Sequence, residues 1–273
     1  MKIKNLATIL GFGVLGFNNL QGQNHSLEPI IFNSKYHSEH TNAIEQYEPY
    51  NRQEISLDSN FNILNAGLKE YLNKIYIVDQ KDFFDSNIAG HAHPYGGIIC
   101  LTEYFTNQEL FHEASHIRNL ALDEINSDFS KKWKEIANFE YGEENIKLDI
   151  HSEEPLVKWK DETIGPKDGL MGPYSAKNLN EDIATFVGYS LAPEGLLTLE
   201  DIGYIFERPL SEEDESKIKS YAASYPFYFA DTTDHRYKQK LDLLKEYNFF
   251  TKEEHEKLSN DLGSLRYLLK KEE

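Results

Sequence analysis

Our prediction of the fold begins at one stretch, Thr106-Asn-Gln-Glu-Leu-Phe-His-Glu-Ala-Ser-His116. Its first four residues have a capping-box pattern, in which the Thr106 and Glu109 side chains satisfy free backbone N–H groups at a helix start. We therefore predict a helix from Thr106 to about Leu122. Two histidines four positions apart lie on one face of such a helix, so their imidazoles project toward a common point.

Residues 112–116 fit the pattern His-Glu-x-x-His, which on a helix is typical of zinc sites in hydrolases. Neutral imidazole binds Zn²⁺ well, so His112 and His116 are predicted to share one ion. Glu113 can approach a water on that ion without occupying its coordination sphere, which is the position of a general base. The alternative is a surface helix that carries two histidines at this spacing by chance.

A catalytic zinc site usually has three protein ligands and one open position. The metzincin pattern is excluded because Asn119 and Leu122 stand where it requires glycine and histidine. We predict Glu181 as the third ligand, early in a helix that starts at Asn178. The alternative is that Glu181 completes a capping box with Asn178 and bonds to backbone instead of metal.

The run Gly172-Pro-Tyr-Ser-Ala-Lys-Asn-Leu-Asn-Glu-Asp-Ile-Ala184 resembles the second motif of a gluzincin group of zinc metallopeptidases. That group holds the anthrax lethal factor catalytic domain and the Pro-Pro endopeptidases. In it a tyrosine stands seven positions before the glutamate ligand, and Tyr174 and Glu181 keep this separation. Residues 90–101 also resemble the group's glycine-rich approach to an edge strand. The resemblance covers roughly residues 60–190.

The resemblance implies a zincin-like fold and hydrolysis of peptide bonds with one Zn²⁺ per chain. It implies His112, His116 and Glu181 as zinc ligands, Glu113 as general base and Tyr174 as a stabiliser of the transition state. Ordinary aromatic packing is the alternative for the tyrosine, since the chain contains 17 tyrosines.

The sequence departs from the group's pattern at a few positions. Ser175 stands where alanine is common, and Thr185 stands where a second acidic residue often follows the glutamate ligand. Asp182 is then a candidate to support the histidine ligands, which usually donate their free N–H to an acceptor. The separation of the second histidine from the glutamate ligand is long for this group, which predicts an insertion at about 125–165 beside the substrate cleft.

The remaining pattern predicts an α+β fold, with a small sheet followed mostly by helices. Strands are predicted at 75–78 and 97–101, and the second is a candidate edge strand for pairing with an extended peptide, with a buried strand as the alternative. Loops are predicted at 90–96 and 141–173. The predicted helices lie at 59–73, 129–140 and 178–189, with further helices starting near Ser211, Asp234 and Thr251.

Residues 1–23 are predicted to be a signal peptide, because a basic start precedes an apolar run that is too short to span a bilayer. An uncleaved anchor or a buried helix is the alternative. We expect export to periplasm, cell surface or medium without a stable membrane anchor. A polar, irregular lead-in at 24–52 and one catalytic domain at 53–273 complete the predicted organisation.

The chain has 28 Lys and Arg against 46 Asp and Glu, a formal net charge of −18, which disfavours binding to nucleic acid. Its single cysteine, Cys100, cannot form an intramolecular disulfide and is predicted to be an apolar filler. His91 and His93 could bind a second metal, although loop histidines are more often without one.

Taken together, these observations predict an exported zinc endopeptidase that acts on an extended peptide or protein. The alternatives are a non-catalytic binding module on a peptidase scaffold and a zinc hydrolase of a non-protein amide or ester.

Overall fold

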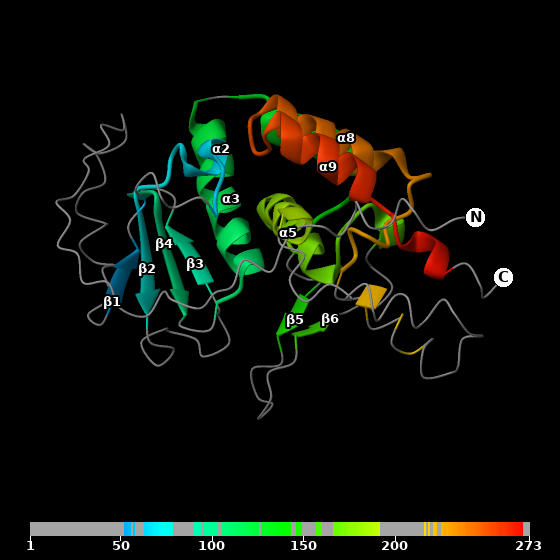
Figure 1. Ribbon diagram of the computed structural model, residues 1–273, viewed down its shortest axis with the longest axis horizontal. Coiled ribbons are helices and arrows are strands. Elements are labelled where there is room, and N and C mark those ends of the chain that lie inside the picture. Colours follow the sequence, from blue (N-terminus) through cyan, green and yellow to red (C-terminus); the bar gives the residue numbers. More distant parts are fainter. Residues whose placement is uncertain are drawn as a thin grey trace.

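The computed structural model is α+β, with a small mixed sheet and a larger helical part, as the sequence predicts (Figure 1). The structure describes residues 52–55, 57, 63–78, 90–93, 96–102, 105–125, 127–142, 146–148, 157–159, 166–191, 216, 218, 221–222 and 225–269. The predicted signal peptide, the lead-in up to residue 51 and the helix start at Ser211 lie outside these residues. The division into one catalytic domain at 53–273 stays a prediction.

Four strands form a mixed sheet in the order β1-β2-β4-β3. β2 and β4 are parallel, whereas β1 and β3 run antiparallel to their neighbours. The predicted strands at 75–78 and 97–101 are confirmed, each within one residue of its observed bounds. The bounds are Arg52–Ile55 for β1, Lys74–Val78 for β2, Gly90–His93 for β3 and Ile98–Thr102 for β4.

The prediction that 97–101 is an edge strand is wrong, because β4 lies between β2 and β3. All five residues of β4 are buried, as expected of a strand covered on both faces. The edge strand is β3, within the predicted loop 90–96. Its sequence Gly-His-Ala-His has no apolar run, so periodicity gave no signal for a strand there.

Helix α3 (Asn107–Glu124) lies against β3 and β4 and carries the histidines (Figure 1). Its predicted capping box is confirmed: Thr106 Oγ1 accepts from the Glu109 N–H at 3.3 Å, and the Glu109 carboxylate accepts from the Thr106 N–H at 2.6 Å. Helix α5 (Leu179–Leu191), close to the predicted 178–189, packs along the other side of α3. The helix α3 therefore lies between the sheet and α5.

The backbones of α3 and α5 approach closely at Gly188. A Cβ on that residue would lie 3.0 Å from the Gln108 carbonyl oxygen and 3.5 Å from the His112 Cβ. Glycine is needed here for the close approach of two helices. The crossing brings the first turn of α5, which contains Glu181, alongside the histidine face of α3.

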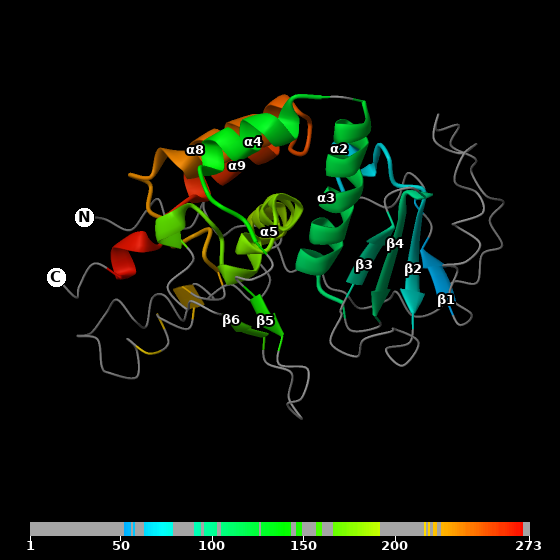
Figure 2. The same cartoon turned by 180° about the vertical axis from the view of Figure 1, so that it is seen from behind.

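The outer helices are α4 (Phe129–Ala137), α8 (His235–Glu246) and α9 (Lys252–Asp261). Figure 2 shows α4 beside α8. These elements confirm the predicted helix at 129–140 and the predicted starts, because Asp234 and Thr251 are the N-cap residues of α8 and α9. Aromatic side chains fill the space between them and α5, namely Phe129, Trp133, Phe186, Phe227, Tyr237 and Phe249.

The predicted helix at 59–73 is wrong in length, since only α2 (Ala66–Lys69) is helical there among the residues described. Asn65 caps it by accepting from the Leu68 N–H, while its amide donates to the Phe249 carbonyl. Arg118 donates to the Gly67 carbonyl at 2.6 Å, an oxygen that a longer helix would use for its next turn. Hydrogen bonds to distant residues thus accompany the end of the helix at Lys69, where the apolar periodicity alone predicts that it continues to residue 73.

The prediction of a loop throughout 141–173 is also wrong. An antiparallel hairpin, β5 (Ile146–Leu148) and β6 (Val157–Trp159), lies within it and next to the 3₁₀ turn η6 (Pro173–Ala176). Each strand is three residues long, too short to show a period of two. Two further 3₁₀ turns are η5 (Pro166–Asp168) and η7 (Arg266–Leu268). Among the described helices, none has the combined length and apolarity that crossing a membrane requires.

We expect Gly188→Ala to lower the free energy of unfolding by about 1–3 kcal/mol, because the added methyl group overpacks the α3–α5 crossing. Gly172→Ala is the matched control, since a Cβ there meets no atom within 4 Å. Thermal and urea unfolding of both variants measure the effect. Equal stability of the two would contradict the tight crossing.

Candidate metal centre

Three potential ligand atoms converge where α3 meets α5. His112 Nε2 lies 3.1 Å from Glu181 Oε2 and 3.1 Å from His116 Nε2, and His116 Nε2 lies 3.3 Å from Glu181 Oε2. The two histidines come from successive turns of α3, and Glu181 comes from the first turn of α5. The structure thus brings together three residues that the sequence separates widely.

The size of this triangle fits a tetrahedral metal site. Zinc–nitrogen and zinc–oxygen bonds of about 2.0–2.2 Å at tetrahedral angles place neighbouring ligand atoms roughly 3.3–3.5 Å apart. The three measured separations, 3.1, 3.1 and 3.3 Å, are close to the edges of one face of such a tetrahedron. Two imidazole nitrogens and a carboxylate oxygen are also the donor types that zinc prefers.

The electrostatics of the triangle favour positive charge at its centre. Burial alone would raise the pKa of Glu181, but hydrogen bonds from His112 and His116 hold that pKa far below its ordinary range. Burial opposes a charge on His116, yet its hydrogen bond to Glu181 and the nearby Glu113 charge raise its pKa. The carboxylates therefore make this a site for a proton or a metal cation.

The Glu181 carboxylate faces the histidines, and the Asn178 side chain caps the start of the helix as the capping pattern predicts. Asn178 Oδ1 accepts from the Glu181 N–H at 2.9 Å. The Glu181 carboxylate is hydrogen-bonded across the helix crossing to His112. The side chain of a first-turn residue is thus free for a ligand role while the helix start stays capped.

Tyr174, in η6, approaches the same carboxylate. Its hydroxyl donates to Glu181 Oε1 at 3.1 Å, and its ring centroid lies 6.1 Å from that of His112. Burial, with the charge of Glu181, raises the pKa of Tyr174, so the phenol keeps its proton. The structure therefore places a protonated hydroxyl beside the triangle.

Lys177 is a member of the site that the sequence analysis missed. Its ammonium lies 3.5 Å from Glu181 Oε1 and 5.6 Å from the centroid of the Tyr174 ring. The signal that could have found it is its spacing, four positions before Glu181 on the same side of the chain. The Lys177 ammonium thus places a positive charge beside the Glu181 carboxylate.

Glu113 is buried beside the edge strand, with 8% of its surface exposed. A Cβ on Gly90 of β3 would lie 3.0 Å from the Glu113 Cγ and 3.3 Å from its Oε1. The absence of a side chain on Gly90 therefore lets β3 pass directly over the predicted general base.

Asp182 does not support the histidines, which corrects the role we considered for it. Its Oδ2 accepts from Trp133 Nε1 at 2.7 Å, Tyr141 Oη at 2.8 Å and Lys240 Nζ at 2.7 Å. Its Oδ1 has no hydrogen-bond partner in the part of the chain that the structure describes. Asp182 points away from the triangle because the next residue of a helix lies about 100° around its axis.

His91 and His93 lie on one side of β3, with ring centroids 4.5 Å apart. Among the described residues, His112, His116 and Glu181 form a group of three possible metal ligands, and this pair is not part of it. Cys100, the single cysteine, is buried in β4, in agreement with its predicted role as an apolar filler.

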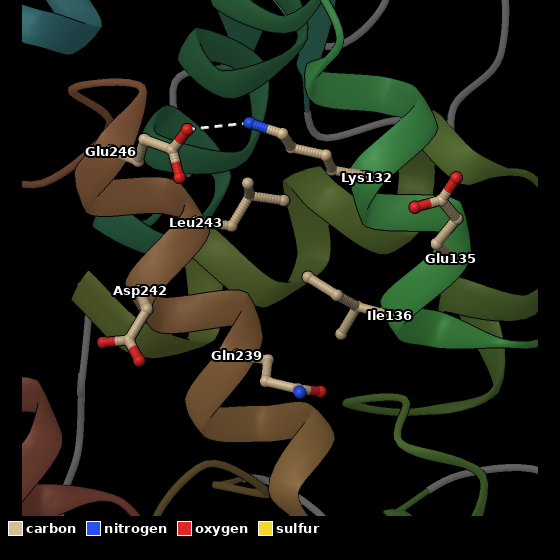
Figure 3. Close-up of a pocket in the computed structure, with 7 residues that line it drawn as sticks. All are labelled: Lys132, Glu135, Ile136, Gln239, Asp242, Leu243 and Glu246. Atoms are coloured by element: carbon tan, nitrogen blue, oxygen red, sulfur yellow. Dashed lines mark hydrogen bonds and ion pairs between the residues drawn. The ribbon is translucent and has the colours of Figure 1, made fainter.

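A separate groove of about 450 Å³ lies between α4 and α8 (Figure 3). Its charged side chains are already paired: Lys132 with Glu246 at 2.8 Å, and Asp242 with His255 at 2.7 Å. None of the three triangle residues lines this groove. It therefore does not contribute to the candidate metal centre.

No protein-family model, curated protein or solved structure matches this chain. The gluzincin resemblance therefore stays a prediction from the sequence motifs at residues 112–116 and 172–184.

The His91–His93 pair predicts acid sensitivity. Burial, together with the charge of His91, lowers the pKa of His93 from 6.5 to about 4. Between these values the unfolded chain binds this proton and the folded chain does not, so stability falls as the pH decreases from about 6.5 to about 4. We expect His93→Gln to lose less stability than wild type between pH 7 and pH 5, measured by urea unfolding. The same loss in both proteins would contradict this.

Proposed function

We propose that this chain is an exported, zinc-dependent peptidase with a zincin-like fold. The observation that carries the proposal is the triangle of His112, His116 and Glu181, whose edges fit one face of a tetrahedral zinc site. Glu113 follows the first histidine and is buried on the same helix, where its charge acts on His116. A metal site with a carboxylate next to it is what hydrolysis by activated water requires.

The chemistry would divide between the ion and two side chains, Glu113 and Tyr174. A bound Zn²⁺ would supply a water of lowered pKa and polarise the carbonyl of the scissile bond. Glu113 accepts the proton of the attacking water and delivers it to the leaving nitrogen. The hydroxyl of Tyr174 is a protonated donor beside the ligand set, so it can stabilise negative charge on the carbonyl oxygen in the transition state.

The substrate we propose is an extended peptide or protein segment. β3 pairs with β4 on one side, and no described strand pairs with its other side. An extended peptide can add to such an edge through backbone hydrogen bonds. The contact of Gly90 with Glu113 would bring that peptide past the proposed general base. We therefore propose β3, instead of the strand at 97–101, as the edge strand that pairs with the peptide.

Two other functions use the same scaffold. A binding module without catalysis would need the ligand triangle but not a buried carboxylate beside it, so the placement of Glu113 favours an enzyme. Hydrolysis of a non-protein amide or ester would use the same groups, and the edge strand favours a peptide instead.

We expect the purified protein to contain about one zinc per chain and Glu181→Ala to lose most of it, because two imidazoles alone hold zinc weakly. Elemental analysis of both proteins measures this, with the exposed-acid variant Glu135→Ala as matched control. No zinc in wild type after supplementation would overturn the proposal. Equal zinc in wild type and Glu181→Ala would show that another group is the third ligand.

We expect Glu113→Gln to keep its zinc and to cleave peptides about 10²–10⁴ times more slowly than wild type, as the loss of a general base predicts. Cleavage of a mixed peptide library followed by mass spectrometry measures the rates, and zinc content shows that the site is intact. An active Glu113→Gln enzyme would exclude this residue as the base. A zinc-loaded wild type that cleaves no peptide would favour one of the other two functions.

A further inference from the structure

Four side chains from different parts of the chain meet at the residue that follows Glu181: Trp133, Tyr141, Asp182 and Lys240. We call them the Asp182 cluster. Three donors bind one oxygen, Asp182 Oδ2, at 2.7, 2.8 and 2.7 Å. Trp133, Asp182 and Lys240 have no exposed surface. The cluster joins α4, the segment after it, α5 and α8.

Burial of the ion pair between Asp182 and Lys240 costs free energy. Removing a carboxylate and an ammonium from water has a desolvation penalty that their attraction often fails to exceed, and apolar side chains of similar size are frequently as stable. Lys240 is satisfied further by the Gly169 carbonyl at 2.9 Å and lies 4.9 Å from the centroid of the Trp133 ring. Such an arrangement fixes directions more strictly than apolar packing does, since every hydrogen bond has a required angle.

The cluster holds Asp182, the residue that follows Glu181 in α5, through three hydrogen bonds. On the other side of Glu181, Asn180 accepts from Asn119 Nδ2 of α3 at 2.8 Å. Residues 180 and 182 lie about 200° apart around the axis of α5. The two contacts therefore hold the first turn of α5 from different sides and prevent its rotation. The Glu181 side chain between them is directed toward His112 and His116.

The same cluster reaches the segment that carries Tyr174. Tyr141 is followed by Gly142, whose N–H donates to the Ala176 carbonyl of η6 at 3.2 Å. The hydrogen bonds of Tyr141 to Asp182 and of Gly142 to Ala176 thus link the cluster to the segment that carries the proposed transition-state donor. A shift of the cluster would move both the third ligand and Tyr174.

We infer that Asp182 is a positioning residue for the metal centre. Through its three donors it holds the first turn of α5 so that the Glu181 carboxylate faces the two histidines before a metal ion binds. The inference rests on the proposed function in one respect, that His112, His116 and Glu181 bind a metal. Preorganised ligands lose less conformational freedom on binding, so the cluster raises metal affinity without touching the ion.

The test compares two Tyr→Phe variants of the full chain. Tyr141→Phe removes one hydrogen bond to Asp182 and leaves both charges of the ion pair in place. Tyr237→Phe is the matched control, because its hydroxyl donates to the Pro166 and Leu170 carbonyls at 2.8 and 3.1 Å and makes no hydrogen bond to Asp182. Trp133→Phe is a second test variant, which removes a different donor from the same oxygen.

The readouts are the zinc dissociation constant, by competition with a chromophoric chelator, and the melting temperature of each metal-free protein. We expect Tyr141→Phe and Trp133→Phe to weaken zinc binding about tenfold, the lower end of the effect of outer-shell groups. Tyr237→Phe should lower the melting temperature of the metal-free protein and leave the zinc affinity within twofold of wild type.

Wild-type zinc affinity in both test variants would overturn the inference and leave the proposed function intact. Zinc affinities that fall with melting temperature in all three variants alike would also overturn it, because the cluster would then act through general stability. A wild-type protein that binds no zinc would overturn the proposed function and the inference together.

Discussion

The close crossing of α3 and α5 is the constraint on which the candidate metal centre depends, because neither helix holds it alone. α3 supplies two imidazoles, and α5 supplies the carboxylate. Gly188 allows the two backbones to approach, and the hydrogen bond from Asn119 to Asn180 ties the helices one residue from Glu181. The sheet on one side of α3 and the outer helices on the other keep this crossing in place.

Charge balance explains why two adjacent carboxylates can be buried in the first turn of α5. A buried carboxylate needs a cation and hydrogen-bond donors to offset its desolvation. Asp182 has Lys240, on the side away from the histidines. Glu181 needs a different cation, because about 100° of helix rotation separates the two side chains. The raised pKa of His116 and the nearby Lys177 meet part of this need, and a divalent ion would meet it in full.

Local signals in the sequence predicted the helix that carries the histidines, its capping box and the strand segments. The proposed third ligand required more, because Glu181 is distant in the chain; its place early in a helix that starts at Asn178 and its spacing from Tyr174 predicted that role. Non-local pairing could not be predicted: the position of β4 inside the sheet, the ending of the 59–73 pattern by Arg118, and the partners of Asp182, which lie 41 to 58 residues away. Each of these depends on which distant segment fills a site, and periodicity carries no such information.

The exchange of β4 for β3 as the edge strand also changes how a substrate would meet the site. Helix α3 lies against both β3 and β4, but β4 is paired on both sides, so among the described strands next to α3 only β3 has an edge at which a peptide could add. Gly90 lies close to Glu113, since a Cβ on it would be 3.0 Å from the Glu113 Cγ, so the backbone of β3 passes next to the proposed general base. A scissile carbonyl held on β3 by backbone hydrogen bonds would then be positioned by the same strand that passes next to Glu113. Positioning of substrate and base by one rigid element is what an activated water requires, since both must keep their geometry to within a fraction of an ångström.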